Sequence, residues 1–132
     1  MLALIFAVAL ALANVYHARV ERVIDGDTVR VTVRIWHDQD VHTSIRLRGI
    51  DTPELRARCA RERELALAAK AALVEMLPAG STITLTNLRP DKYGGRFDAD
   101  ARTADGRDPA AELIAQGHAR AYGGEARLGW CL

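Results

Sequence analysis

Apolar and polar residues alternate along much of the first half of the chain. From Val29 to Trp36, Val or Ile occupies every second position between arginines and threonine, which is the period of a strand with one buried face. The β-branched segment 15–24 precedes it, and Asp25-Gly26 between the two is a hairpin signal. Residues 41–47 alternate again after a turn at 37–40, so we expect three strands that form a meander.

A change of period marks the start of the second half. Pro53 excludes an ordinary central strand, and between Arg58 and Leu77 apolar residues recur at helical spacing, which predicts a long helix with one buried stripe. The stripe comprises Leu65, Ala69, Ala72, Leu73, Met76 and Leu77. Pro78-Ala79-Gly80 ends this helix.

Two more strands and a short helix are expected beyond it. Residues 81–87 alternate isoleucine and leucine with threonines, and residues 96–102 form a fifth predicted strand. Asp108 followed by Pro109 supplies an N-cap and a first-turn proline for a short helix that ends at Gly117. These elements predict an α+β, mainly β fold: a five-stranded Greek-key barrel of the OB type, capped by one long and one short helix.

The length and composition fit one globular domain. The chain has 132 residues, of which 49% are hydrophobic and 27% charged, so it has no room for a separate cofactor domain and is not of disordered composition. The net charge of +1 gives no overall field that would attract nucleic acid. Lys70 and Lys92 are the only lysines, and the planar fork of the many arginines suits a phosphate partner.

Residues 1–13 carry no charged side chain and are mostly apolar. The run is shorter than the roughly 20 residues needed to span a bilayer, and Ala11-Leu12-Ala13 has the small-x-small pattern of a signal-peptide cleavage site. We therefore expect a signal peptide, a domain over residues 14–132, a secreted or periplasmic location, and a monomer without stable membrane association. Because no basic leader precedes the run, an uncleaved anchor is the alternative.

Cys59 and Cys131 are far apart and are not spaced for zinc. They could form a disulfide that joins the C-terminus to the start of the long helix. Closing a loop of that length would stabilise the fold by about 4 kcal/mol in the chain-entropy account. Two unpaired thiols are the alternative.

Two short stretches carry most of the candidate chemistry. Asp27 lies where the first predicted hairpin returns, and Asp51 lies just past the end of the third strand. Neighbouring strands could bring both carboxylates to one rim of the barrel, where hard oxygen ligands suit calcium or magnesium rather than zinc. Arg46, on the polar face of the third strand, could then bind a phosphate beside the metal.

These residues resemble the staphylococcal nuclease family. The resemblance runs from about Val20 to Tyr122, and three motifs occur in the family's order. They are Ile24-Asp25-Gly26-Asp27-Thr28, Arg46-Leu47-Arg48-Gly49-Ile50-Asp51-Thr52-Pro53-Glu54 and Asp91-Lys92-Tyr93-Gly94-Gly95-Arg96. The resemblance implies a calcium-dependent phosphodiesterase that hydrolyses DNA and RNA by in-line attack of water and leaves 3′-phosphate ends.

The resemblance also implies a role for each motif residue. Calcium would be held by the carboxylates of Asp27 and Asp51 and the backbone carbonyl of Thr52. Glu54 would be the general base, and Arg46 and Arg96 would bind the phosphate. The nucleotide pocket would be lined by Lys92, Tyr93 and Tyr122. Gly95 adds a residue to the family's spacing, so the reach of Arg96 depends on how that turn bulges.

Two further alternatives stay open. The exposed-looking arginines that follow Glu54 could track a phosphate backbone or could be a solvated helix start; they are Arg56, Arg58, Arg61 and Arg63. The same barrel could also bind nucleic acid or a protein without cutting it. Loss of a metal carboxylate or a phosphate-binding arginine would mark that case, and neither is lost here.

Overall fold

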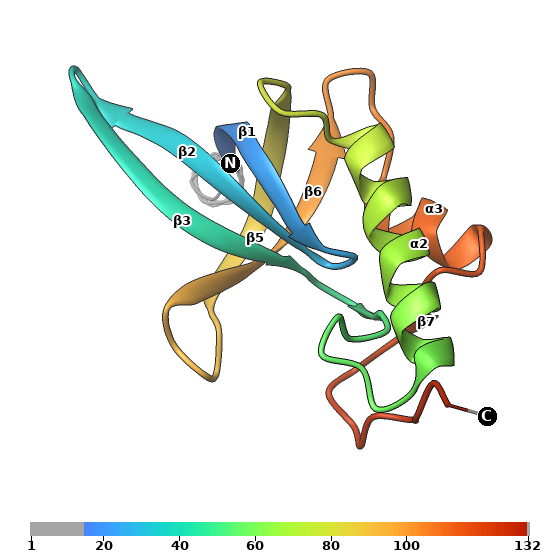
Figure 1. The fold of residues 1–132 in the computed structure, drawn as a ribbon. Coiled ribbons are helices and arrows are strands. Elements are labelled where there is room, and N and C mark those ends of the chain that lie inside the picture. Colours follow the sequence, from blue (N-terminus) through green and yellow to red (C-terminus); the bar gives the residue numbers. More distant parts are fainter. Residues whose placement is uncertain (1–14, 132) are drawn as a thin grey trace, which may run out of the picture.

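Five strands close into a barrel, and two helices pack against it (Figure 1). The strand order is β1-β2-β3-β6-β5; β3 and β6 pair in parallel, and the other neighbours pair antiparallel. The strands are β1 (Val15–Asp25), β2 (Thr28–Trp36), β3 (Gln39–Leu47), β5 (Thr82–Pro90) and β6 (Arg96–Thr103). This architecture confirms the predicted α+β, mainly β barrel of the OB type.

This computed structural model describes residues 15–131. The expected signal peptide over residues 1–13 lies outside the described residues. Among those described, no helix is both long enough and apolar enough to cross a membrane.

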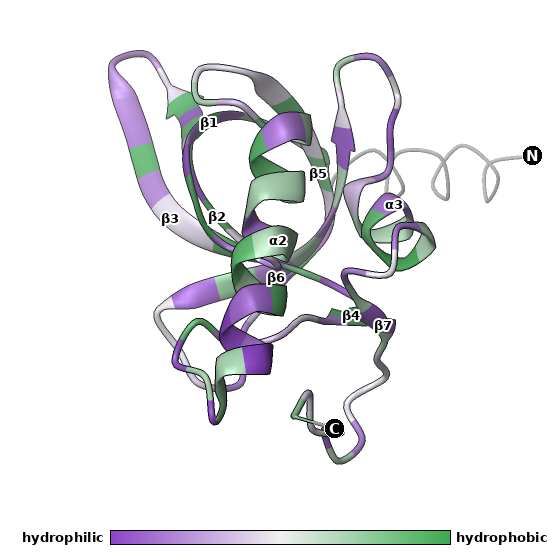
Figure 2. Cartoon of the chain, turned by 45° about the vertical axis from the view of Figure 1, so that its right-hand side comes forward, coloured by the Kyte–Doolittle hydropathy of each residue, from purple (hydrophilic) through white to green (hydrophobic). Residues whose placement is uncertain are grey.

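The barrel interior is filled by the alternating apolar residues of the strands. Val29, Val31, Ile45 and Leu47 are each at most 1% exposed, and Figure 2 shows hydrophobic and hydrophilic bands alternating along β3. The predicted alternation fails at the end of β2, where Ile35 is 58% exposed. The β2–β3 hairpin extends beyond the other strands there (Figure 1), so no opposing layer covers its apolar face.

Helix α2 (Ala60–Met76) lies across one side of the barrel. Cys59 is its N-cap, and the Cys59 Sγ accepts a hydrogen bond from the Glu62 N–H at 3.3 Å. Most of the predicted stripe is buried, although Leu65 and Ala72 are only half-buried. The buried residues of the helix are Glu62, Ala66, Ala69, Leu73 and Met76; the burial of Glu62 was not predicted.

Three short elements and a disulfide complete the fold. Helix α3 (Pro109–Ala115) begins at the predicted N-cap, where the Asp108 side chain accepts the Ala111 N–H at 3.2 Å. Strand β4 (Ile50–Asp51) pairs with β7 (Arg120–Ala121) in a two-stranded sheet that was not predicted. Cys59 and Cys131 are joined in a disulfide, which places the C-terminal residues beside the N-terminus of α2.

The β1–β2 turn is seated directly against α2. A Cβ atom added to Gly26 would lie 2.8 Å from the Ala69 Cβ and 3.1 Å from the Thr52 Oγ1. Real Cβ atoms do not approach so closely, so glycine is required here by the lack of space. The contact fixes the position of Asp27, the next residue, relative to the loop that begins at Thr52.

Gly26→Ala is therefore expected to push the turn away from the helix and to lower the free energy of unfolding by about 1–3 kcal/mol. Urea denaturation of Gly26→Ala, Ala69→Gly and the double variant would measure this. Because Ala69→Gly removes the atom with which the new methyl group collides, the double variant should be more stable than the sum of the single changes predicts. Strict additivity of the two changes would contradict a steric contact.

Candidate active site

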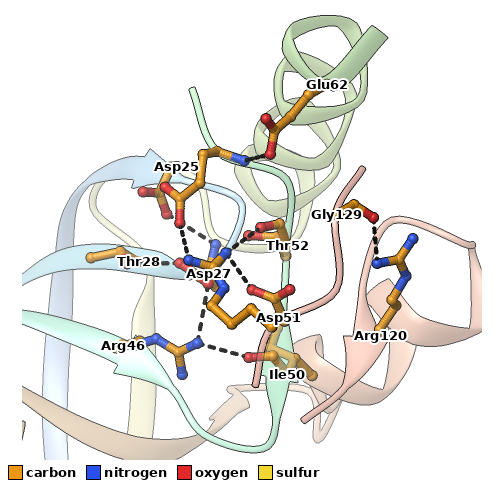
Figure 3. Close-up of polar contacts among 12 residues, drawn as sticks. Asp25, Asp27, Thr28, Arg46, Ile50, Asp51, Thr52, Glu62, Arg120 and Gly129 are labelled. Carbon is orange, nitrogen blue, oxygen red and sulfur yellow. Dashed lines mark hydrogen bonds and ion pairs between the residues drawn. The ribbon is translucent and has the colours of Figure 1, made fainter. Parts of the chain in front are cut away.

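One cavity of about 520 Å³ opens where the β1–β2 turn, the end of β3 and the β5–β6 loop meet. Most of the residues predicted to form the site line this cavity: Asp27, Arg46, Glu54, Lys92, Tyr93, Arg96 and Tyr122. Asp51 and Thr52 are each only 3% exposed, and Figure 3 shows them beside Asp27 and Arg46. The fold thus gathers residues that are up to 95 positions apart in the chain (Asp27 to Tyr122).

Asp27 is held on its backbone and on its side chain. Its N–H donates to the Asp25 Oδ1 at 3.1 Å, and its carbonyl accepts the Leu47 N–H at 2.8 Å, which joins the turn to the end of β3. The Thr28 Oγ1 donates to the Asp27 Oδ1 at 2.9 Å. Asp25, in contrast, serves mainly to shape the turn.

The carboxylate of Asp27 lacks sufficient positive charge around it. Burial, followed by the negative charge and hydrogen bonding of Asp25, raises the pKa of Asp27 to about 6. Arg46 and Thr28 oppose this rise, but the Arg46 Nη2 lies 3.6 Å from the Asp27 Oδ2, too far for a strong hydrogen bond. A further cation near Asp27 would stabilise its ionised form.

Arg46 is held rigidly beside Asp27. Its Nη2 donates to the Ile50 carbonyl at 2.9 Å (Figure 3), and its Nη1 donates to the Leu47 carbonyl at 3.3 Å. The guanidinium carbon lies 5.9 Å from the centre of the Tyr122 ring, within cation–π range. These contacts fix the guanidinium at the wall of the cavity.

An arginine outside the predicted motifs lies at the acidic end of the site. The Arg127 Nη2 is 2.5 Å from the Asp51 Oδ1 and donates to the Thr52 carbonyl at 3.3 Å. The Arg127 Nη1 donates to the Glu54 Oε1 at 2.6 Å. Sequence reasoning missed this residue because it lies in an aperiodic segment some 75 positions from its partners.

The loop that carries Glu54 is held by a second unpredicted residue, Glu62. The Glu62 Oε1 accepts the Arg58 N–H at 2.8 Å, and its Oε2 accepts the Glu54 N–H at 3.4 Å. The hydrogen bond from Arg58 is the largest cause of a lowered pKa for Glu62. A buried carboxylate thus fixes the loop backbone, while the Glu54 side chain itself is 48% exposed.

Arg96 reaches the cavity despite the extra glycine. Gly94 and Gly95 both have positive φ angles, of 74° and 75°, which glycine adopts at no steric cost, and the Asp91 N–H donates to the Arg96 carbonyl at 3.0 Å to close the loop. The Asp91 Oδ2 then lies 3.1 Å from the Arg96 Nε. The bulge is therefore compatible with the predicted position of Arg96.

Asp91 is a second positioning group that the motif analysis did not single out. Its carboxylate accepts the Tyr93 N–H at 2.9 Å. Burial acts to raise its pKa, but this hydrogen bond, Asp98 and Arg96 together lower it. Burial and the neighbouring Asp91 raise the pKa of Asp98. Asp91 is thus the ionised partner that holds the Arg96 guanidinium.

The aromatic residues of the predicted nucleotide pocket differ in exposure. Tyr93 is 78% exposed, and the Lys92 Nζ lies 5.1 Å from the centre of its ring. Tyr122 is half-buried, and its N–H donates to the Gly49 carbonyl at 2.8 Å. Tyr93 therefore offers an open face to a ligand, whereas Tyr122 also packs against the barrel end.

Within residues 15–131, no cluster of three or more His, Cys, Asp or Glu side chains could hold a metal ion by itself. The donors that fit a hard cation are two carboxylates, from Asp27 and Asp51, and the carbonyl of Thr52. The Asp51 Oδ1 is buried and has no hydrogen-bond partner; the Arg127 contact at 2.5 Å is an ion pair. Carboxylate and carbonyl oxygens suit calcium or magnesium, whose other ligands can be water and phosphate.

Comparison with known proteins gives a consistent result. Residues 44–127 match the family described as "Staphylococcal nuclease homologue". Two proteins named "Uncharacterized endonuclease", from Escherichia coli O157:H7 and from Escherichia coli, are each 32% identical over 106 residues. These 106 residues cover 80% of this chain but only 61% of each relative.

The raised pKa of Asp27 predicts a pH-dependent stability in the presence of a chelator. The stabilising contribution of the protonated carboxyl is complete below about pH 4 and is lost as the pH rises through about 6. Asp27→Asn should therefore gain stability over the wild type on going from pH 4 to pH 7, by about 3 kcal/mol. Urea denaturation across this pH range would measure the gain.

Asp38→Asn is the matched control, because Asp38 lies in the exposed β2–β3 turn at a positive φ of 57° that asparagine also tolerates. Its stability difference from the wild type, followed over the same pH range, shows the effect of an aspartate-to-asparagine change at an exposed position. If the stability difference of Asp27→Asn followed the same pH dependence as that of Asp38→Asn, burial and Asp25 would not destabilise the ionised form of Asp27.

Proposed function

Because this chain belongs to the staphylococcal nuclease family, we propose that it is a metal-dependent nuclease that hydrolyses phosphodiester bonds in DNA and RNA. The observation that carries the proposal is the convergence of Arg46, Arg96 and Glu54 on one cavity, with buried Asp51 and Thr52 behind it. The endonuclease names of the two relatives support the same reaction class.

Two arginines would bind the scissile phosphate. Arg46 is fixed by two backbone carbonyls, and Arg96 is fixed by the Asp91 carboxylate. Guanidinium groups held in this way need no reorganisation as negative charge grows on the phosphoryl oxygens, so they stabilise the transition state more than the ground state. A calcium ion held by Asp27, Asp51 and the Thr52 carbonyl would supply Lewis-acid polarisation of the same phosphate.

Glu54 is the candidate general base. Its carboxylate lines the cavity and is half exposed, so it can accept a proton from a water molecule on one side of the phosphate. In-line attack by that water would release the 5′ oxygen and leave a 3′-phosphate, as the family resemblance implies. The backbone hydrogen bond to Glu62 limits how far Glu54 can move.

Recognition of the nucleotide is proposed to be tolerant of sequence. The open ring of Tyr93 could stack on any base, and Lys92 beside it would attract a neighbouring phosphate. The arginines that follow Glu54 are all exposed and available for backbone contacts: Arg56, Arg58, Arg61 and Arg63. We also propose export to an oxidising compartment, which the Cys59–Cys131 disulfide supports.

A direct test is digestion of plasmid DNA and of RNA with calcium or with excess chelator. The wild type should cut both polymers only with calcium, and Arg46→Ala should lower the rate by about 10³ to 10⁵, as loss of a phosphate-stabilising arginine does. Arg34→Ala, which removes an exposed arginine paired with Asp40 on the distant hairpin, should leave the rate unchanged. If the folded protein retained both polymers on a gel but left them intact with calcium, the chain would be a binding module of the same fold.

Asp91→Asn should lower kcat by about 10²-fold with a smaller effect on KM, because it frees the Arg96 side chain from its aligned position. The effect should largely disappear when the change is made in an Arg96→Ala background. Asp100→Asn is the control, since Asp100 pairs with Arg48 outside this loop. Equal losses from Asp91→Asn in both backgrounds would show a general structural role instead.

A further inference from the structure

The guanidinium of Arg127 occupies the acidic centre of the site. One nitrogen, Nη2, contacts both the Asp51 Oδ1 and the Thr52 carbonyl. The other terminal nitrogen, Nη1, binds the Glu54 carboxylate. A single positive group thus satisfies two of the proposed metal ligands and the proposed general base at once.

Arg127 belongs to a segment, residues 123–131, that we name the C-terminal strap. Among the described residues it contains neither helix nor strand (Figure 2), and most of it is exposed, including Leu128 at 72%. Among the described residues, Arg127 makes the only side-chain hydrogen bonds between the middle of the strap and the barrel. The other strap hydrogen bonds lie within the strap or at its end. The strap can therefore move without disturbing the core.

Both ends of the strap are anchored. At its start, β7 pairs with β4 and the Tyr122 N–H donates to the Gly49 carbonyl. At its end, Cys131 is bonded to Cys59, and the Arg120 guanidinium lies 3.6 Å from the centre of the Trp130 ring and donates to the Gly129 carbonyl at 3.0 Å. A tether at both ends raises the effective concentration of Arg127 at the acidic centre.

We propose that Arg127 is an internal competitor of the divalent cation and that the disulfide-anchored strap sets the strength of this competition. The proposal rests on the metal-dependent function proposed above. At 2.5 Å from the Asp51 Oδ1, the guanidinium fills the space in which that oxygen would contact an ion. Cation binding therefore requires Arg127 to leave.

Departure of Arg127 has a second effect on the site. The same guanidinium donates to the Glu54 Oε1 at 2.6 Å, so this oxygen already has a donor in the position that a water molecule would need. Release of Arg127 frees Asp51 and Glu54 together. Binding of a cation at Asp51 would therefore also free the Glu54 carboxylate. Without the cation, Glu54 stays bound to Arg127.

The test is calorimetric titration of the chelator-treated full-length protein with calcium chloride, without nucleic acid. Arg127→Gln should bind calcium about tenfold more tightly than the wild type, the scale expected for removal of a competing, partly exposed ion pair. Arg127→Lys should fall between the two, since a compact ammonium cannot bridge both carboxylates as a planar fork does. Arg22→Gln, which removes one exposed positive charge from the barrel wall, should change the affinity less than twofold.

Release of the tether should act in the same direction. Cys59→Ser/Cys131→Ser keeps an oxygen at the N-cap of α2 in place of the sulfur and should tighten calcium binding, though less than Arg127→Gln does. Circular dichroism would confirm that each variant is folded. Because the titration uses no substrate, its outcome is independent of catalysis.

Two outcomes would overturn the inference in distinguishable ways. If the wild type bound calcium and folded Arg127→Gln bound it equally or more weakly, Arg127 would support the ligands rather than compete, while the proposed nuclease function would stand. If neither the wild type nor Arg127→Gln bound calcium, both the competition and the calcium-dependent function would fail.

Discussion

Negative charge buried at one end of the barrel is the constraint on which the site depends. Asp27 and Asp51 are at most 9% exposed, and a buried carboxylate without a positive neighbour costs several kcal/mol. Arg46 and Thr28 offset this cost only in part for Asp27, whose pKa stays raised. Asp51 is paired with Arg127. In the nuclease proposed above, a substrate phosphate would be repelled by these carboxylates unless positive groups stood between them. In the structure, Arg46 beside Asp27 and Arg127 beside Asp51 supply the positive charge at this end of the barrel.

Much of the fold could be predicted from periodicity. Strands such as β2 bury one face, so Val29, Val31 and Val33 mark the core directly, and the helical spacing around Ala69 and Leu73 marks α2. The prediction that Ile35 is buried was wrong. Alternation of apolar and polar residues indicates that a strand has an apolar face, but not whether another layer covers that face. Motif spacing located Asp27, Arg46 and Arg96 because each lies at a turn or strand end that the motif itself defines.

The remaining parts depend on contacts that carry no local pattern. The pairing of β4 with β7 involves two residues on each side, too few to show a period. Glu62 lies among arginines, as a solvated residue would, and only the loop folded over it makes it a buried acceptor. Arg127 lies in the aperiodic strap. The disulfide and the pairing of β7 with β4 anchor the two ends of the strap and so place Arg127 beside its partners. Such long-range choices appear only once the chain is folded.

Barrel closure joins distant parts of the chain: β1 pairs with β5 across registers such as Val15↔Thr86, and β3 pairs with β6 across Ser44↔Arg96. Long-range pairings of this kind are slow to form, because the chain loses loop-closure entropy before the contacts can stabilise it. A chain that ends before Arg96 lacks β6 and part of the cavity wall, so it cannot form the pocket. In the nuclease proposed above, the two phosphate-binding arginines, Arg46 and Arg96, would therefore come together only after the last strand of the barrel has been made.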